Sequence, residues 1–132
     1  MKTLLFASLL AAPFLAHAQT DSIEAKRKTC HHRASITNEM KQCEYNAYKE
    51  ADAELARLNQ RLLENIERDH TPDSKELKTR VMNANRTWEE YRDANCALKS
   101  GQMIGGSGES LLLATCAVNA TLDRVKELQT LL

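Results

Sequence analysis

The 132-residue sequence has little that would build a β-sheet and no excess of charge of either sign. Aromatic residues make up only 5% of it, and no segment alternates apolar and polar residues over the length of a strand. Its 18 basic residues match 18 acidic ones, which argues against nucleic-acid or anionic-membrane partners, since both attract basic surfaces. We therefore expect a helical protein with neither kind of partner.

The N-terminus has the pattern of a secretory signal peptide over residues 1–18. Lys2 supplies a positive charge, residues 4–15 form an apolar segment, and Ala16-His17-Ala18 matches an A-x-A cleavage site. The apolar segment is too short to span a bilayer comfortably, and an uncleaved anchor is the alternative. Cleavage after Ala18 would leave residues 19–132 as one domain, with 17 basic and 18 acidic residues. We expect this domain to be periplasmic or secreted and not inserted in a membrane.

The four cysteines, Cys30, Cys43, Cys96 and Cys116, predict two disulfides. An even number of cysteines in a small exported protein is typical of a disulfide framework. Three pairings are conceivable, and closure of the shortest loops favours Cys30–Cys43 with Cys96–Cys116. Each bond would stabilise the fold by roughly 3 kcal/mol in the loop-entropy model. The alternative is a metal site that includes the histidine pair after Cys30, but the chain has no CxxC and adjacent side chains rarely converge on one ion.

Helical periodicity runs through most of the remaining chain. One long helix is expected from Thr37 to His70 and a second from Pro72 to Lys99, with the turn HTPDS between them. A third helix should follow the glycine-rich stretch KSGQMIGGSGES, and a short helix before Thr37 would be held by Cys30. The predicted fold class is all-α: a small disulfide-stapled bundle of two long antiparallel helices and a third that returns along them.

The segment WEEYRDANC, residues 88–96, gathers the only tryptophan, a tyrosine, an Arg-Asp pair and a cysteine. On a helical wheel centred on Trp88, Tyr91 lies on the same apolar side, whereas Arg92 and Cys96 lie on one flank. The acids of the segment point away from that side: Glu89, Glu90 and Asp93. The segment is therefore predicted to be a core seam rather than an active site.

Arg92 borders this apolar side, so its guanidinium should be half-buried. Asp52 lies on the comparable flank of the first long helix, at a similar height above the turn. We expect an ion pair between these two residues, which would fix the register of the helices rather than add much stability. The alternative is a pair of exposed charges that contributes little.

No grouping of residues points to catalysis. GGSG, residues 105–108, lacks the preceding strand and the lysine of a phosphate-binding loop. His31, His32 and His70 have no serine and acid at the spacing of a catalytic triad, and Glu89-Glu90 is typical of a solvated helix face. We expect no enzymatic activity, no cofactor and no metal ion.

Several motifs together resemble the LprI-like lysozyme-inhibitor family, from about Cys30 to Leu128. They are TNEMKQC, AYKEADAEL, NRTWEEYRDANC, GGS and TLDRVKEL. The most specific is W-x-x-Y-R-D-x-x-C, matched by Trp88, Tyr91, Arg92, Asp93 and Cys96. The resemblance implies a small exported bacterial protein with paired disulfides, and inhibition of host lysozyme. The sequence departs from the family pattern at Ala56 and Asn59, where an asparagine and a tyrosine are usual.

Two functions are therefore expected. One is binding and inhibition of lysozyme or a related lytic enzyme, and the other is a periplasmic interaction or envelope-stress module with a different protein partner. The loop Lys99–Glu109 is best suited to reach an enzyme cleft, and a Cys96–Cys116 bond at its base would reduce its ordering cost on binding. The partner-binding residues proposed from the sequence are Gln102, Met103, Ile104 and Ser107.

Overall fold

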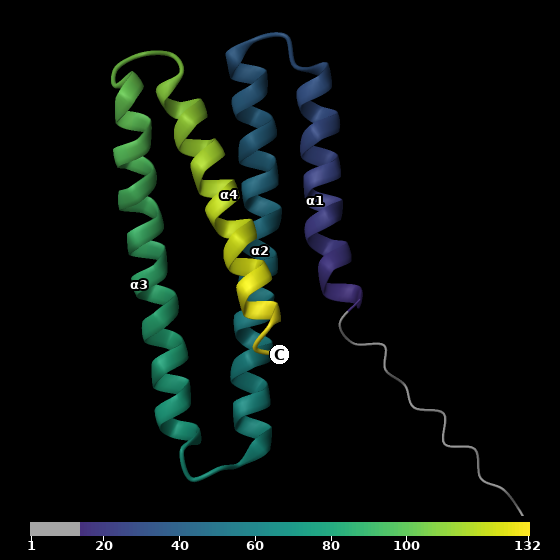
Figure 1. The fold of residues 1–132 in the computed structure, drawn as a ribbon, viewed down its shortest axis with the longest axis vertical. Helices are drawn as coiled ribbons and strands as arrows, with labels where there is room; N and C mark the ends of the chain where they lie inside the picture. Colours follow the sequence, from purple (N-terminus) through teal and green to yellow (C-terminus); the bar gives the residue numbers. More distant parts are fainter. Residues whose placement is uncertain (1–13) are drawn as a thin grey trace, which may run out of the picture.

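The computed structural model describes residues 14–132, which form a bundle of four α-helices (Figure 1). The helices are α1 (Phe14–Arg33), α2 (Thr37–Asp69), α3 (Ser74–Ser100) and α4 (Glu109–Gln129), with a single 3-10 turn, η1, at Gly101–Met103. α1 and α3 run in one direction and α2 and α4 in the other, so the α1–α2 and α3–α4 connections lie at the same end of the bundle (Figure 1). No residue in the described range forms a strand, and the predicted all-α bundle is confirmed.

The turn between the two long helices lies where the HTPDS signal placed it. α2 ends at Asp69 because His70 adopts a left-handed conformation with φ 46°, a common geometry after a helix C-terminus. α3 begins at Ser74 rather than at Pro72, and the Ser74 hydroxyl donates to the carbonyl of Ile66 (3.1 Å). This bond ties the start of α3 to the last turn of α2.

The core is built mainly by α2 and α4, with one large apolar side chain from each outer helix. α2 and α4 share the most extensive helix–helix contact, and α3 packs more on α4 than on α2. One buried cluster comprises Ile23 of α1, Ala47 and Ala51 of α2, and Val118 and Leu122 of α4. The other comprises Leu55 and Leu58 of α2 and Val125 and Leu128 of α4, with Trp88 of α3 packed against it. The long helices α2 and α3 are antiparallel as predicted, but α4 supplies most of the packing surface of α3.

The buried face of α3 differs from the predicted one. Arg92, Cys96 and Ser100 are buried and Trp88 is half-buried, so the buried positions repeat every fourth residue. Tyr91 is 64% exposed and Leu98 77% exposed, so the placement of Tyr91 in the core seam was wrong. The Cys96 disulfide and the interhelical contacts of Arg92 set the rotation of α3 about its axis. These constraints determine which face of α3 is buried, whereas a helical wheel considers only where the apolar residues lie.

The predicted signal peptide, residues 1–18, lies mostly outside the described residues, and its cleavage remains a prediction. α1 crosses the predicted cleavage site. Buried Thr20 and Ile23 and the disulfide at Cys30, which hold α1 to the bundle, all follow that site. The docking of α1 therefore depends on residues that would remain after cleavage. From residue 14 onward, none of the helices combines the length and apolar character needed to cross a bilayer.

Candidate functional site

The connection between α3 and α4, residues 101–108, consists of consecutive hydrogen-bonded turns. The Ile104 amide donates to the Gly101 carbonyl (3.3 Å), and the Gly106 amide donates to the Met103 carbonyl (2.8 Å). Ile104 (φ −52°, ψ 128°) and Gly105 (φ 74°) are the central residues of a type II turn, in which the second central position favours glycine because its φ is positive. Ile104 therefore lies at the apex of a preformed turn.

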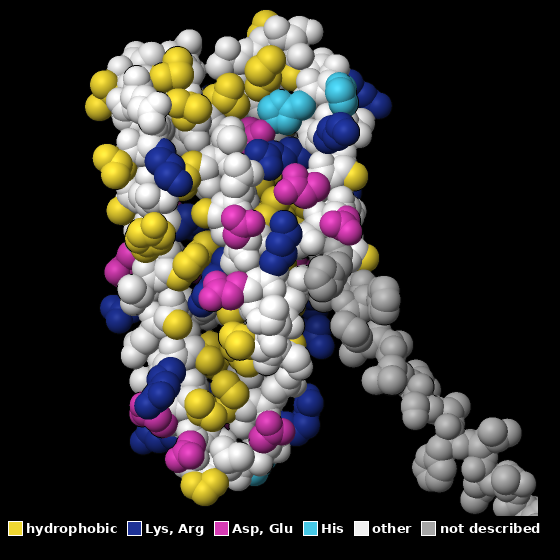
Figure 2. Space-filling model, viewed as in Figure 1, with side chains coloured by type: hydrophobic (Ala, Val, Ile, Leu, Met, Phe, Trp, Pro, Cys, Tyr) yellow, Lys and Arg dark blue, Asp and Glu magenta, His cyan; other side chains and the backbone are white. Residues whose placement is uncertain are grey.

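All four residues proposed from the sequence lie on the surface of this connection. Ile104 is 80% exposed, and Gln102, Met103 and Ser107 are also exposed. The Gly105 amide donates to the Glu109 carboxylate (2.8 Å), which fastens the turn to the start of α4. Hydrophobic side chains gather at this end of the molecule (Figure 2). Residues 100–108 contain no charged side chain, so the connection presents an uncharged apolar tip.

The base of the connection is held by the Cys96–Cys116 disulfide, which joins α3 to α4 with the two Cα atoms 5.5 Å apart. The second disulfide, Cys30–Cys43, joins α1 to α2. The structure thus forms the two bonds that closure of the shortest loops favours. Because residues 101–108 are bounded by a covalent bond and contain their own turns, little ordering remains to occur when they meet a partner.

A groove of about 560 Å³ opens beside the tip, between α2, α3 and α4. Its volume is within the usual range for ligand sites, and its lining is mainly apolar. Lys41 and Ser110 also border a neighbouring hollow of about 350 Å³ that includes Ser107, so the groove continues toward the tip. The residues that line the groove are Lys41, Gln42, Tyr45 and Tyr48 of α2, Asp93, Cys96 and Ala97 of α3, and Ser110, Leu113, Ala114 and Ala117 of α4.

Arg92 links three helices next to the groove. Its buried guanidinium donates from Nε to Asp93 of the same helix (2.9 Å) and from Nη1 to the Thr121 hydroxyl of α4 (3.4 Å). Nη1 also lies 3.5 Å from Oδ1 of Asp52 on α2, so the ion pair predicted from the sequence is present. Burial lowers the pKa of Arg92, but the hydrogen bond to Asp93 and the neighbouring negative groups raise it above its ordinary value. The guanidinium therefore stays charged in its buried position.

Tyr48 contributes a half-buried phenol to the groove. Its ring centroid lies 5.3 Å from Cζ of Arg92, and the Trp88 ring lies 5.1 Å from the same atom, both within cation–π range. Burial raises the pKa of Tyr48, Arg92 lowers it, and three acids raise it: Asp52, Asp93 and Glu89.

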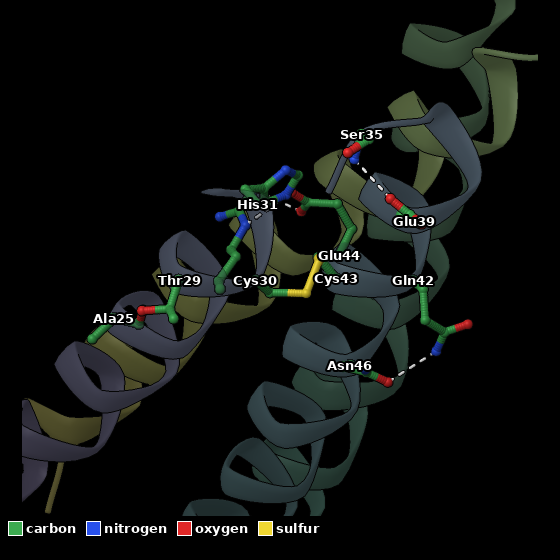
Figure 3. Close-up of a disulfide and its surroundings, with 11 residues drawn as sticks. Ala25, Thr29, Cys30, His31, Ser35, Glu39, Gln42, Cys43, Glu44 and Asn46 are labelled. Carbon is green, nitrogen blue, oxygen red and sulfur yellow. Dashed lines mark hydrogen bonds and ion pairs between the residues drawn. A yellow bond between two sulfur atoms is a disulfide. The ribbon is translucent and has the colours of Figure 1, made fainter. Parts of the chain in front are cut away.

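The α1–α2 connection at the same end is closed by a buried charge cluster (Figure 3). Glu44 of α2, only 3% exposed, accepts a hydrogen bond from Nε of Arg27 (3.1 Å) and contacts Nε2 of His31. Arg27 also donates from Nη1 to Asn119 of α4 (2.7 Å). Oε2 of Glu44 lies 2.7 Å from Nη2 of Arg27 as an ion pair without hydrogen-bond geometry. These contacts hold α1 against α2 and α4. Within residues 14–132, no group of three or more His, Cys, Asp or Glu residues is placed to hold a metal ion.

The groove and the buried Glu44 cluster were not predicted from the sequence. A wheel drawn for one helix cannot show which faces of three helices border the same space. One feature of the sequence could have indicated the groove. Ala114 and Ala117 are small side chains on successive turns of α4, and they leave room beside larger neighbours. For Glu44, the charged residues Arg27 and His31 were visible in the sequence, but their approach depends on how α1 packs.

The chain matches a known protein family. The matching family model is described as Lysozyme inhibitor LprI, and the match covers residues 16–128, including both disulfides, the α3–α4 connection and the groove. No curated protein and no solved structure matches the chain. The two disulfides and the matched family together indicate an extracytoplasmic protein.

Proposed function

We propose that this chain, which belongs to the LprI lysozyme-inhibitor family, binds and inhibits a lysozyme or a related lytic enzyme. The observation that carries the proposal is the family match over residues 16–128, which spans nearly all of the four helices. The contact we propose is the α3–α4 connection, with Ile104 at its apex entering the substrate cleft of the enzyme.

The charge and shape of the connection support this contact. Lysozymes are usually cationic proteins with acidic catalytic clefts. Because residues 100–108 carry no acid, the tip would not be repelled by the catalytic carboxylates. Full burial of the Ile104 side chain would contribute about 2 kcal/mol. The preformed turn and the disulfide below it limit the ordering cost of binding.

We further propose that the protein is exported by cleavage after Ala18, so that residues 19–132 form a single mature domain in the periplasm or outside the cell. The A-x-A pattern at residues 16–18 and the two disulfides support this proposal. The intact mass of protein recovered from a periplasmic extract tests it, because a chain that retains residues 1–18 would contradict the proposed cleavage.

A lysis assay tests the proposed function. Purified, oxidised protein is added to a cationic lysozyme acting on bacterial cells, and the half-inhibitory concentration is measured. Ile104→Asp places a charge at the apex of the tip, and we expect it to raise that concentration about tenfold or more. Met82→Asp is the matched control, because Met82 is an apolar side chain of α3 that is 55% exposed and lies outside the connection.

Inhibition by the wild-type protein tests the proposed function, and the comparison of the two variants tests the proposed contact at Ile104. Undiminished lysis in the presence of a large molar excess of wild-type protein would overturn the proposed inhibition. If Ile104→Asp and Met82→Asp reduce inhibition equally, the result would contradict the proposed contact between Ile104 and the enzyme.

A further inference from the structure

We propose that the groove between α2, α3 and α4 receives a lysine or arginine side chain of the target enzyme. The charged group of that side chain would lie at Asp93, and its apolar stem would lie along α4. The inference rests on the proposed function, because the occupant belongs to the lytic enzyme. It adds a second contact, beside the one made by Ile104.

The first support is the acidic character of the groove near Asp93, at the end away from the tip. Asp52 and Asp93 both approach Arg92, so two carboxylates share one guanidinium and leave a net charge of about −1. Glu89 adds negative potential at Tyr48. Arg92 engages Oδ1 of Asp93, whose side chain is 69% exposed, and no described residue donates to Oδ2. A cation from a partner would therefore meet negative charge at Asp93 that Arg92 balances only in part.

The second support is the chemistry of the walls. Lysine and arginine bury their methylene stems against apolar surface while the charged end reaches a polar group. Ala114 and Ala117 leave width along α4 for such a stem. Tyr45 and Tyr48 add aromatic rings, and Nζ of Lys49 already lies 4.9 Å from the Tyr45 ring centroid. Aromatic rings attract cations, so the two tyrosines suit the charged end of a lysine or arginine side chain.

An anionic occupant fits these walls less well. Lys41 is the one cation among the residues that line the groove, and it lies at the end shared with the neighbouring hollow. An anion paired with Lys41 would extend toward the acidic end at Asp93. The two kinds of occupant therefore respond differently to Lys41→Gln, which should maintain or raise the affinity for a cationic occupant and lower it for an anionic one.

A titration with a small probe tests the groove without a lysozyme. N-acetyl-arginine amide is added to isotopically labelled protein, with N-acetyl-norleucine amide as the uncharged analogue, and the backbone amide signals are followed by NMR. We expect roughly millimolar binding of the arginine probe, with shifts at Tyr45, Tyr48 and Ala97. Asp93→Asn should abolish these shifts, and Glu90→Gln, on the exposed side of α3, should keep them. Shifts confined to another surface, or unchanged by Asp93→Asn, would overturn the inference.

The same variants in the lysis assay separate this inference from the proposed function. Asp93→Asn should raise the half-inhibitory concentration about tenfold, while Glu90→Gln leaves it unchanged. Urea unfolding of each variant verifies that the fold is retained. If the wild-type protein inhibits lysis and Asp93→Asn inhibits equally well, the groove contact is overturned and the proposed function is retained. Arginine binding in the groove without lysozyme inhibition would retain the cation site and overturn the proposed function.

Discussion

The two connections at one end of the bundle each have a disulfide at their base, yet their surroundings differ (Figure 1). Residues 34–36 join α1 to α2, and beside them Glu44 is buried against Arg27 and His31. Residues 101–108 join α3 to α4 and expose an apolar apex, with an open groove next to them. We call these the closed corner and the open corner.

A disulfide at a corner shows that the two helices are held together, but not what the corner does. At the closed corner the charged groups pair with one another, so the available interactions are used to hold α1. At the open corner, the Ile104 side chain is 80% exposed, and beside the groove two carboxylates share one guanidinium. Groups that are left without an internal partner are the ones that a binding partner can satisfy.

A large effect on stability is expected from breaking the charge cluster of the closed corner. Glu44→Ala removes the buried carboxylate of Arg27 and leaves it only the longer contact with Glu24 (3.6 Å), and we expect the free energy of unfolding to fall by about 3 kcal/mol. Urea unfolding measures this loss. Glu67→Ala, which removes a surface pair with Lys78, is the control and should cost about 0.5 kcal/mol. If both variants lose the same free energy of unfolding, the buried ion pairs of Glu44 contribute no more to stability than a surface pair.

Removing one disulfide at a time compares the two corners directly. Cys30→Ala/Cys43→Ala and Cys96→Ala/Cys116→Ala should each lower the free energy of unfolding by about 3 kcal/mol, because the loops closed are of similar length. Only the second pair should also weaken lysozyme inhibition, by about tenfold, because it frees the connection that carries Ile104. The assay is run at a temperature at which both variants remain folded. A similar loss of inhibition in both would contradict the separate roles of the corners.

The smallest effect is expected from two glycines of the open corner. Gly105→Ala forces a residue with a Cβ to adopt φ 74°, and we expect a loss of about 1 kcal/mol, seen as a lower midpoint of thermal unfolding. Gly101→Ala, at φ −57°, should be neutral or stabilise by about 0.5 kcal/mol. An added Cβ meets no atom within 4 Å at either position, so the pair isolates the backbone conformation. Equal shifts would mean that the turn at Ile104 and Gly105 is not held in its left-handed form.

Much of the fold could be predicted because its signals are local. The turn before Ser74 and the connection ahead of Glu109 follow from proline and glycine patterns within a few residues, and α2 begins at Thr37, where the helical periodicity begins. For the candidate site, the sequence identified the exposed connection and the Asp52–Arg92 contact. It did not identify the groove, and it placed Tyr91 on the wrong face, because the rotation of α3 depends on bonds to another helix.

The sequence by itself determined the two long helices, the helix after the glycine-rich stretch, their order and the glycine that lets residues 103–106 turn, since each depends on neighbours along the chain. It favoured the two shortest disulfide loops without deciding between the three pairings. Only the tertiary structure decided that α4 packs between the long helices, that Glu44 is enclosed at one corner, and that Asp93 and two tyrosines border one groove at the other. Those features depend on how helices rotate against one another. That rotation is set by packing, ion pairs and disulfides between residues far apart in the chain.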